Sequence, residues 1–505
     1  MLYAGFDCST QSLTVVVIDV GGSTREVVFR DTLAFDADLP QFGTRHGVSV
    51  SQPGGVIHTS PLLWAAALDV MLGRLARGID ARRLRAISGA AQQHGSVCCG
   101  ETPDVLTRTT SPIWMDSSTG RECADIEAAL GGPAALAQLT GSRAFPRFTG
   151  PQIRKFAREE PDAYARTTRI HLVSSYLASR LIGRHAPIDH ADGSGMNLMD
   201  LRALAWSARA VDATAPDLAA RLPRLEAPWA IAGQLAPYWQ KRYGFPPAQV
   251  VAWSGDNPCS LIGTGLAVEG QLGISLGTSD TVFGPIREPR VSADGTGHAF
   301  ASPTGEYMGI TVFRNGSLAR ERIRDRFALD WKGFAAALSC TPAGNDGAMM
   351  LPWFDPEITP PVAQPAVKTH GLDGAAPPRF VRALVEAQMM ALALHSRWMG
   401  VSATRIHATG GAAASPDILQ VMADVFNATV HRFESTDSAA LGAALRAWQA
   451  DARLPWREIL EDFCRPLTRA IDPLPPNVRA YQSLQRRYSA FERAALAGDK
   501  LDSGS

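Results

Sequence analysis

Cysteine is scarce in this chain, and neither sign of charge is in excess. Seven cysteines are spread over 505 residues and none forms a CxxC pair, which predicts reduced thiols and a cytoplasmic protein. Lys plus Arg and Asp plus Glu both number 49, so the net field favours neither nucleic acid nor an acidic membrane surface. Basic runs with interleaved aromatic residues are also missing, and we expect no nucleic-acid binding.

Long hydrophobic runs are missing as well. No uninterrupted apolar stretch is long enough to cross a bilayer. The first ten residues, MLYAGFDCST, have no basic segment and reach an acidic residue at Asp7, unlike a secretory signal peptide. The sequence therefore predicts no membrane segment.

The length exceeds what one hydrophobic core usually supports. At 505 residues, with 46% apolar and 19% charged residues, the chain is expected to form two globular domains. A second beginning follows Tyr243, where two prolines break the chain before an apolar strand, QVVAW. We predict an N-terminal domain over 1–246, a C-terminal domain over 247–490 and a polar tail over 491–505.

Two β-hairpins begin the two halves. Residues 2–19 and 270–284 each read as a strand, a turn of small polar residues and a second strand. They align without gaps, Gly5 with Gly273 and Thr10 with Thr278, at a spacing of 268 residues. One turn chemistry at the start of each half indicates a duplicated two-domain α/β fold.

Other segments carry helix and strand signals. A polar loop over 36–61 leads into a helix over 60–78, for which Ser60 is the candidate N-cap. Residues 405–433 read as a strand, a Gly-Gly turn, a helix and a strand, and a further helix is expected over 436–448. These units are typical of α/β domains.

The two hairpin turns are candidate phosphate-binding sites. Consecutive backbone N–H groups and small hydroxyl side chains form a concavity that suits phosphate oxygens. Each turn alone is also what an ordinary hairpin contains, but its recurrence favours a triphosphate held between the two. Asp7, at the end of the first strand, is a candidate Mg²⁺ ligand, directly or through water, or else a turn-capping acid. The candidate phosphate residues are Ser9, Thr10, Gln11, Gly277, Thr278 and Ser279.

Asp256 is the candidate catalytic carboxylate. It follows the apolar strand QVVAW, with Asn257 next to it, and α/β proteins place catalytic groups at the carboxyl ends of strands. Phosphoryl transfer to an alcohol needs a base that accepts the hydroxyl proton. The local alternative is an Asp-Asn turn ahead of Pro258.

Three further side chains suit a polyol. Gln93 and His94 both donate and accept hydrogen bonds. Arg147 is able to bind sugar hydroxyls, and an ordinary salt bridge explains it equally well. A structural role is likewise open for His94.

A glycine turn late in the chain suits a nucleotide. Gly410 and Gly411 allow a ligand to approach the backbone closely, and Ser415 is the expected N-cap of the next helix. Helix packing alone would also explain the two glycines.

Familiar nucleotide and hydrolase motifs are missing or out of context. The chain has no GxxxxGKS/T, which excludes a P-loop, and no GxGxxG or HExxH. Residues 273–277 fit the GxSxG pattern of a serine hydrolase, but that motif has to lead into a helix. A strand-like run, TSDTVFG, follows instead, so a serine hydrolase is a minor alternative.

These segments, taken together and in order, resemble the FGGY carbohydrate kinases of the actin-like ATPase superfamily. The resemblance runs from GFDCSTQSLTVVVID to AALGAALRAW, nearly the whole chain. It includes stretches with no general nucleotide-binding role, among them DLPQFGTRHGV, SGAAQQHGSV, PIWMDSSTGREC and LTGSRAFPRFTG, together with SGDNPCSLIGTGL, ISLGTSDTVF and ATGGAAASPDILQVMADVF. Within the family the match is nearest to the animal-type kinases of D-xylulose.

The resemblance implies a fold and a set of roles. It implies two ribonuclease H-like domains around a deep cleft, with sugar on the N-terminal domain and ATP on the C-terminal one. By position, Asp256 matches the family's catalytic base. The other implied roles are sugar binding for His94, Arg147, Asp256 and Asn257 with Gln93 beside them, nucleotide binding for Trp331, Gly410 and Gly411 with Ser415 close by, and metal and phosphate binding for Asp7, Thr10 and Thr278.

Two stretches depart from the patterns of many relatives. The glycine turn reads GGAAAS where many have GGGxxS/N, so Ala412 and Ala413 leave the adenine contacts open. WMDSS stands where many bacterial relatives have WNDGR, which agrees with the animal-type subgroup. Asp116 lies in this motif, near the expected sugar, without an assigned role.

The sequence thus predicts an ATP- and Mg²⁺-dependent kinase of a small ketopentose, D-xylulose, that works by domain closure. Ribulose, fuculose and glycerol are alternative acceptors, because one hydroxyl makes a small difference in a pocket. A chaperone or filament protein of the same superfamily is a distant alternative that would not need the polar sugar set. The family also suggests a homodimer.

Overall fold

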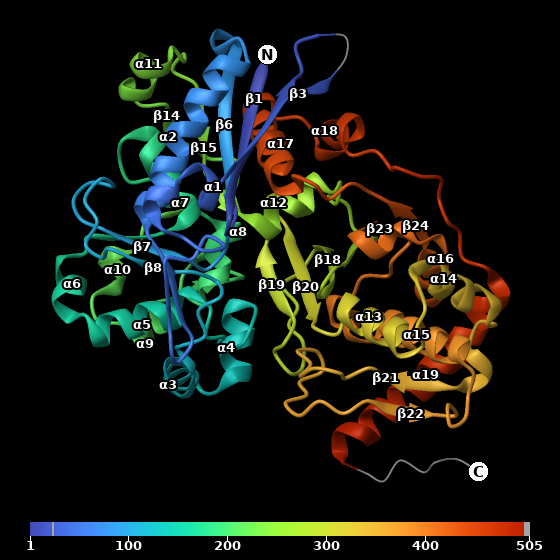
Figure 1. The fold of residues 1–505 in the computed structure, drawn as a ribbon. Coiled ribbons are helices and arrows are strands. Elements are labelled where there is room, and N and C mark those ends of the chain that lie inside the picture. The colour runs from blue at the N-terminus through green and yellow to red at the C-terminus, as the bar shows by residue number, and fades with distance from the viewer. Residues whose placement is uncertain (23–24, 499–505) are drawn as a thin grey trace.

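The computed structural model describes residues 1–22 and 25–498, and each half of the chain is built around one mixed β-sheet (Figure 1). The first sheet has the strand order β14-β15-β6-β1-β2-β3, and β16 also pairs with β6. The second has the order β19-β20-β18-β17-β23-β24. The strands are β1 (Leu2–Cys8), β2 (Ser12–Asp19), β3 (Glu26–Ala34), β6 (Leu84–Ala91), β14 (Ile231–Gln234), β15 (Gln249–Val251), β16 (Ser254–Gly255), β17 (Gln271–Leu276), β18 (Asp280–Ile286), β19 (His298–Ala301), β20 (Tyr307–Phe313), β23 (Arg405–Thr409) and β24 (Thr429–Arg432).

The predicted duplication is confirmed. In the first sheet β1 pairs antiparallel with β2 and parallel with β6, and in the second β17 pairs antiparallel with β18 and parallel with β23. The order β15-β6-β1-β2-β3 therefore recurs as β24-β23-β17-β18-β20. The hairpins begin and end close to the predicted residues, so each half carries the expected ribonuclease H-like arrangement.

Helices cover both faces of the first sheet. Along β2 the valines alternate: Val15 and Val17 pack in a core with α2 (Pro61–Gly78) and α7 (Val173–Ile182), whereas Val16 packs with α17 (Ser438–Ala452). Successive side chains of a strand point to opposite faces. An unbroken apolar run is therefore what a strand buried on both faces requires.

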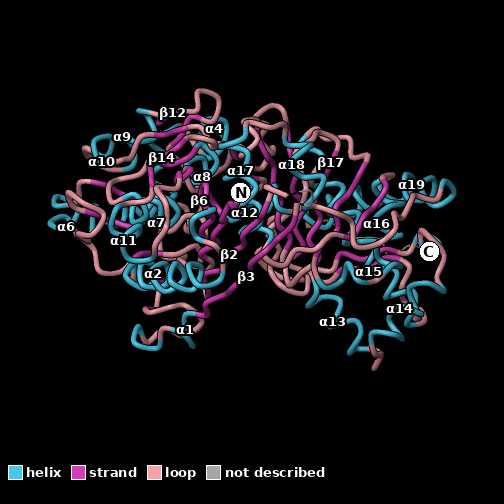
Figure 2. Tube along the Cα trace, turned by 90° about the horizontal axis from the view of Figure 1, so that it is seen from above, coloured by secondary structure: helices cyan, strands magenta, loops and turns pink. Residues whose placement is uncertain are grey.

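Helix α17 connects the two halves of the molecule. It comes from the C-terminal part of the chain yet packs on β1, β2 and β6 of the first sheet and crosses α12 (Asp256–Gly263). In Figure 1 the red α17 lies beside the blue β1, and Figure 2 places α12 and α17 in the middle of the molecule, between the two lobes. Arg446 of α17 is buried, and its Nη2 donates at 3.0 Å to Asp189 Oδ2 in the N-terminal half.

The second sheet packs against its own helices. The core around Ile274, Leu276 and Ile406 includes apolar residues of α13 (Ser317–Arg326), α14 (Trp331–Cys340), α15 (Pro377–His395), α16 (Pro416–Phe426) and α19 (Pro475–Ala497).

The remaining elements lie outside the two main sheets: α1 (Phe35–Asp38), α3 (Gly120–Leu130), α4 (Pro133–Thr140), α5 (Thr149–Glu159), α6 (Pro161–Arg166), α8 (His190–Gly193), α9 (Ala208–Thr214), α10 (Leu218–Arg221), α11 (Pro237–Tyr243), α18 (Trp456–Phe463), β4 (Val50–Gln52), β5 (Val56–Thr59), β7 (Ser96–Cys99), β8 (Ser111–Pro112), β9 (Arg169–Leu172), β10 (Ile188–Asp189), β11 (Met199–Asp200), β12 (Ala205–Trp206), β13 (Leu225–Glu226), β21 (Met349–Leu351) and β22 (Lys368–His370).

The first sheet extends past the predicted domain boundary. The boundary at 246/247 stays a prediction, but β15 and β16 lie beyond it and pair in parallel with β6 of the first sheet. The chain therefore leaves that sheet only after residue 255. Parallel partners are joined through long crossovers, so the pairing leaves no local sequence signal.

The structure departs in part from three local expectations. The predicted loop over 36–61 contains α1 and the short strands β4 and β5. Ser60 occupies the N-cap position of α2, but its side chain makes no capping hydrogen bond, and Pro61 begins the helix. The predicted tail begins too early, because α19 continues to Ala497; residues 499–505 of the tail lie outside the described residues. None of the described helices is both long and apolar enough to span a bilayer.

Candidate functional site

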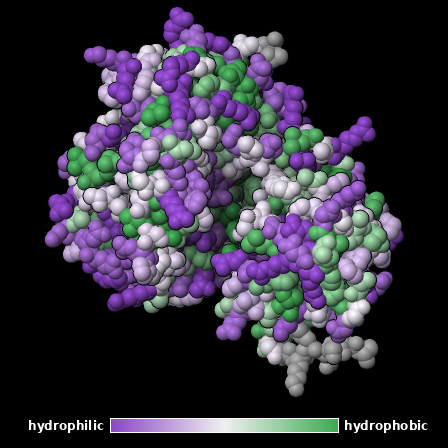
Figure 3. All heavy atoms as spheres, viewed as in Figure 1, coloured by the Kyte–Doolittle hydropathy of each residue, from purple (hydrophilic) through white to green (hydrophobic). Residues whose placement is uncertain are grey.

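A deep cleft separates the two lobes and collects the predicted sugar residues. Figure 3 shows a hollow between the lobes on the face drawn. The cleft, called the main cleft below, has a volume of ≈ 740 Å³. From the N-terminal half and α12 it is lined by Gln93, His94, Arg147, Asp256 and Asn257. From the second sheet and the segments that adjoin its strands it is lined by Ser279, Thr281, His298, Phe300, Ile310, Val312 and Arg314.

Asp256 lies at the first turn of α12, directly after β16. The backbone N–H of Asn257 donates to Asp256 Oδ1 at 2.8 Å, and the Asn257 amide nitrogen donates to the same oxygen at 3.1 Å. That amide also donates to Gln93 Oε1 at 3.0 Å. Asn257 thus engages Oδ1 through two hydrogen bonds. Burial raises the pKa of Asp256 to about 6 and outweighs the hydrogen bonds that stabilise the carboxylate.

His94 occupies a strained turn between β6 and β7. Its φ is 71°, in the left-handed region that a histidine rarely adopts. Nδ1 lies 2.9 Å from the carbonyl oxygen of Gly195 and donates to it, because a carbonyl only accepts, so Nε2 of the neutral ring remains an acceptor. Burial, reinforced by the nearby Arg147 guanidinium, lowers the pKa of His94 to about 3. The ring is therefore neutral at physiological pH.

Arg147 joins the two lobes across the main cleft. Its Nη2 donates to Nε2 of His298, on β19, at 3.0 Å. The guanidinium also lies over the rings of Phe145 and Phe148, at 4.9 and 5.4 Å from their centroids. Burial lowers the pKa of Arg147 to about 10 and, together with the arginine charge, lowers that of His298 well below its usual range. A guanidinium whose neighbours are neutral rings is well placed to hydrogen-bond a polar ligand.

The first hairpin turn opens into a second hollow, called the Asp7 hollow below. It has a volume of ≈ 360 Å³ and is lined by Asp7, Ser9, Asp256, Asn257 and Asp437, among others. The Ser9 hydroxyl donates to Asp7 Oδ2 at 2.7 Å, while Asp7 Oδ1 is buried without a hydrogen-bond partner among the described residues. Burial and the Asp256 carboxylate raise the pKa of Asp7 to about 7. Asp256 and Asn257 line both this hollow and the main cleft, so the two spaces meet there.

The second hairpin turn lies beside the glycine turn of the α/β unit. Strands β17 and β23 run parallel, with Ser275 opposite Thr409, so the turns that begin at Gly277 and Gly410 leave the same edge of the sheet. Gly410 has φ 88°, and a Cβ there would lie 2.5 Å from the carbonyl oxygen of Leu276. Only glycine fits this close approach. Thr278 belongs to the same hairpin turn, and Ser415 caps α16 by accepting from the Ile418 N–H, as predicted.

Two predicted nucleotide residues have other surroundings. Trp331 is the first residue of α14, half exposed, with the Arg324 guanidinium 4.5 Å from its ring centroid. It does not line the main cleft or the Asp7 hollow. Gly411 has no atom within 4 Å of a built Cβ, so its backbone is open to a ligand. The nucleotide roles of both residues stay predictions.

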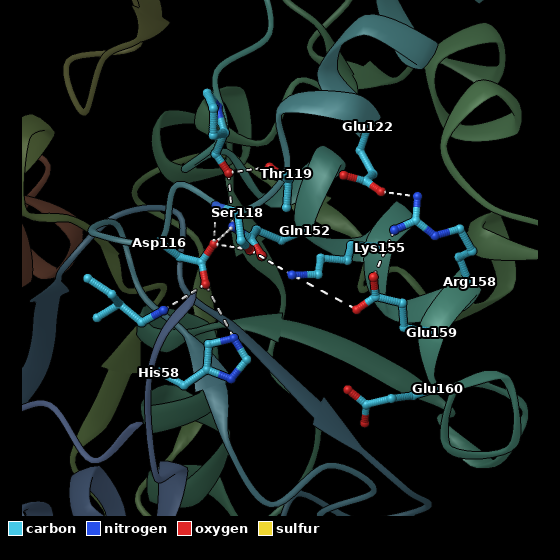
Figure 4. A network of polar contacts seen from close by, with 12 residues as sticks. His58, Asp116, Ser118, Thr119, Glu122, Gln152, Lys155, Arg158, Glu159 and Glu160 are labelled. Atoms are coloured by element: carbon cyan, nitrogen blue, oxygen red, sulfur yellow. Dashed lines mark hydrogen bonds and ion pairs between the residues drawn. The ribbon is translucent and has the colours of Figure 1, made fainter. Parts of the chain in front are cut away.

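Asp116 anchors the loop that forms one wall of the main cleft. Figure 4 shows its carboxylate surrounded by donors from several segments. Oδ1 accepts from the Ser118 hydroxyl at 2.6 Å and from the Gln152 amide at 3.0 Å, and Oδ2 accepts from the Ile57 N–H at 2.9 Å. Nε2 of His58 lies 3.4 Å from Asp116 Oδ2. Despite burial, these bonds keep the pKa of Asp116 well below its usual range. The residue left without a role in the sequence thus fixes a loop.

The loop that Asp116 fixes connects the predicted sugar residues with the predicted phosphate turn. Trp114 and Met115 lie on it and line the main cleft. The indole N–H of Trp114 donates to the Thr10 hydroxyl in the first hairpin turn at 2.8 Å. Sequence reasoning missed Trp114 and His298. The family motif around Trp114 could have indicated a cleft residue. His298 lies in an ordinary strand, and the sequence around it gives no such indication.

Comparisons with known proteins agree with this architecture. Residues 2–263 match the N-terminal domain and residues 272–450 the C-terminal domain of the FGGY family of carbohydrate kinases. The chain is 40% identical over 525 residues to the xylulose kinase of Mus musculus, covering 98% of this chain and 94% of that protein. It is 40% identical over 487 residues to xylulose kinase 2 of Arabidopsis thaliana, covering 88% of this chain and 86% of that protein.

Solved structures share the fold. The crystal structure of xylulose kinase from Rhodospirillum rubrum superposes with a TM-score of 0.86 at 20% identity, over 99% of both chains. Glycerol kinase from Plasmodium falciparum gives a TM-score of 0.82 at 15% identity, over 97% of this chain and 98% of that one. The duplicated sheets, the cleft and the two domain matches together show that the chain belongs to the FGGY family of carbohydrate kinases.

Proposed function

We propose that this chain transfers the γ-phosphoryl group of ATP to D-xylulose and forms D-xylulose 5-phosphate. The observation that carries the proposal is the position of Asp256 and Asn257, at the junction of the main cleft and the Asp7 hollow. A base at such a junction is within reach of an alcohol on one side and a phosphate on the other. The relatives named xylulose kinase, 40% identical over 98% and 88% of this chain, support the acceptor.

Asp256 accepts the proton of the terminal sugar hydroxyl. Its pKa of about 6 leaves the carboxylate ionised at neutral pH while making it a stronger base than an ordinary aspartate. As the hydroxyl oxygen bonds to the γ-phosphorus, the bond from phosphorus to the β,γ-bridging oxygen breaks and ADP leaves with that electron pair. The proton passes to Asp256 Oδ2, the oxygen that Asn257 does not hold.

Neighbouring side chains orient the sugar. The acceptor nitrogen of His94, the Arg147 guanidinium and the Asn257 and Gln93 amides provide donors and acceptors for its hydroxyl and carbonyl groups. His94 is buried, Arg147 is partly buried, and each is held by its own partner. Groups with fixed positions lose little entropy when a substrate binds.

The Asp7 hollow fits a divalent cation with a triphosphate. Asp7 Oδ1 is a buried oxygen without a hydrogen-bond partner among the described residues, and carboxylate oxygens suit Mg²⁺. Those residues contain no cluster of three or more metal-ligating side chains, so phosphate oxygens and water would complete the coordination. Bound there, Mg²⁺ would neutralise phosphate charge. The hairpin turns at Ser9 and Thr10 and at Gly277 and Thr278 would hold the phosphates.

Closure of the lobes would exclude water, which otherwise competes as the phosphoryl acceptor. The Arg147–His298 bond already spans the cleft between the lobes. A homodimer, a cytoplasmic location and the absence of nucleic-acid binding remain predictions that rest on composition and family resemblance.

An acceptor screen tests the proposed function. ADP release by the purified protein is measured with ATP·Mg²⁺ and D-xylulose, D-ribulose, L-fuculose or glycerol, and the phosphorylated carbon is located by NMR. We expect the highest kcat/KM with D-xylulose and phosphate on C5. A higher kcat/KM with another acceptor, or ADP release that no acceptor stimulates, would overturn the proposal.

A further inference from the structure

Arg314 is a charged residue of the main cleft that the proposed reaction does not use. It follows the last residue of β20 and lines the main cleft together with Asp256 and Ser279. Its side chain is exposed. The structure shows a hydrogen bond from its backbone N–H but, among the described residues, no hydrogen bond or ion pair of its guanidinium. Contacts within the described part of the chain therefore do not account for an arginine side chain at this place in the cleft.

The loop that carries Arg314 is joined to the second hairpin turn. The backbone N–H of Ser317 donates to the carbonyl of Gly277 at 2.9 Å. Gln388 donates to the carbonyls of Asn315 and Gly316 at 2.8 and 3.0 Å. The 314–317 loop and the 277–280 turn therefore form one packed unit.

A buried ion pair fixes the turn within this unit. The two terminal nitrogens of the Arg320 guanidinium donate to the two oxygens of Asp280, at 2.9 and 3.0 Å, and Arg320 also donates to Gln388 at 2.9 Å. Arg320 and Asp280 are each about 1% exposed. Bidentate pairs of this kind restrict geometry strongly. The turn expected to hold phosphate and the loop of Arg314 thus keep a fixed distance.

Glu357 holds the same loop from the other side. Its carboxylate accepts from the backbone N–H of Arg314 at 2.6 Å and from that of Asn315 at 3.1 Å. The Asn315 amide also donates to Glu357, at 2.7 Å. Glu357 therefore engages backbone and amide groups and leaves the Arg314 guanidinium for another partner.

Charge in the main cleft indicates what that partner is. Of the described residues that line the cleft, the side chains with a permanent positive charge are Arg147 and Arg314. Arg147 is deep in the site and donates to His298, whereas Arg314 lies with Ser279 of the hairpin turn and with Asp256. A phosphoryl group in transfer spreads negative charge over its equatorial oxygens, and a planar guanidinium matches these oxygens well.

We propose that Arg314 binds the γ-phosphoryl group of ATP and stabilises its charge during transfer. This inference rests on the proposed kinase function and adds a catalytic residue to it. The C-terminal lobe supplies Arg314 and the N-terminal half supplies the sugar contacts, so the arginine would meet its target fully when the lobes close. The proton and the leaving group follow the same path as above, and Arg314 changes no bond itself.

Three variants test the proposal: Arg314→Ala, Arg314→Lys and the control Arg322→Ala. Arg322 lies on the neighbouring helix α13 and pairs with Asp355 at the surface, 3.0 Å away. Arg314→Ala should lower kcat about 10²-fold, the usual size of the loss of one hydrogen-bond donor to a transition state, with less than about threefold change in KM for D-xylulose. Arg314→Lys should keep part of the activity, and Arg322→Ala should match the unmodified protein.

Nucleotide binding separates this proposal from the acceptor assignment. Calorimetry should show that Arg314→Ala weakens binding of a non-hydrolysable ATP analogue about tenfold and leaves ADP binding unchanged, whichever acceptor the enzyme uses. Equal loss for the ATP analogue and ADP, or no loss for either, would overturn the phosphoryl contact. A rise in the sugar KM alone, with kcat unchanged, would reassign Arg314 to the sugar and overturn the proposal as well.

Discussion

At the scale of single residues, Asp256 and Asp7 are both carboxylates whose burial opposes ionisation. Their pKa values rise from 3.8 to about 6 and about 7. Between pH 4 and 7 the folded protein therefore binds more protons at these sites than the unfolded chain does. Stability contributed by these groups is present at low pH and is lost as the pH rises through this window.

The first prediction concerns Asp256→Asn at two pH values. At pH 8 the neutral amide should raise the free energy of unfolding by about 1–3 kcal/mol, because one unit of pKa corresponds to about 1.4 kcal/mol. At pH 4 the gain should nearly disappear, since the wild-type carboxyl is then protonated. Denaturant unfolding at both pH values measures this. The exposed Asp373→Asn is the control, and equal effects of the two substitutions at pH 8 would contradict the burial argument.

The second prediction concerns Asp116 and the loop that it fixes. Asp116→Ala removes the acceptor for Ile57, Ser118 and Gln152 and should loosen the loop that carries Trp114 and Met115. Steady-state kinetics should show the sugar KM rising about tenfold, with a smaller change in kcat, because positioning residues act mainly on binding geometry. Asp212→Ala, an exposed aspartate of α9, is the control. An unchanged KM in Asp116→Ala would show that the loop keeps its place without the carboxylate.

At the scale of elements, the predicted nucleotide site depends on turns that leave neighbouring parallel strands. The turns at Gly277 and Gly410 follow β17 and β23 and meet at one sheet edge. Their chemistry was predictable because glycine, serine and threonine carry local turn signals. The contribution of β19 and of the 314–317 loop was not, because His298 and Arg314 reach the cleft only through strand pairing within the second sheet.

Gly410 and Gly411 form a matched pair for the third prediction. Gly410→Ala should lower the free energy of unfolding by roughly 2 kcal/mol or more, because the residue has φ 88° and its new Cβ would meet the Leu276 carbonyl. Gly411→Ala should leave stability within about 0.5 kcal/mol, since its Cβ would enter open space. Chemical denaturation of both variants measures the difference. Equal loss would mean that the turn does not have this conformation in solution.

At the scale of the whole molecule, the two lobes share the crossing of α12 and α17. Helix α17 belongs to the C-terminal half in sequence and to the first sheet in space, and buried Arg446 links it to Asp189. The duplication was visible in the sequence because the two hairpins repeat at a fixed spacing. The packing of α17 on the first sheet and the pairing of β15 with β6 could not be predicted, because no local sequence pattern indicates which distant segment either element contacts.

The fourth prediction places a methyl group at that crossing. A Cβ at Gly442 would lie 1.9 Å from the carbonyl oxygen of Cys259 in α12, so the helices would have to separate. Gly442→Ala should therefore destabilise the fold by about 3 kcal/mol and lower the Tm. Gly120→Ala, where a Cβ meets no atom within 4 Å at the start of α3, should be neutral. Calorimetric unfolding compares them, and a Gly442→Ala protein as stable as its control would contradict the close crossing.

The proposed reaction depends on Asp256 accepting the proton of the sugar hydroxyl where the main cleft meets the Asp7 hollow. The most direct measurement is single-turnover formation of D-xylulose 5-phosphate by the unmodified protein and by Asp256→Asn, with ATP affinity measured in parallel. We expect a rate at least about 10²-fold lower in the variant with ATP affinity retained, and a wild-type kcat/KM that falls as the pH drops below about 6. A near-normal rate in Asp256→Asn would contradict the role of Asp256 as the base.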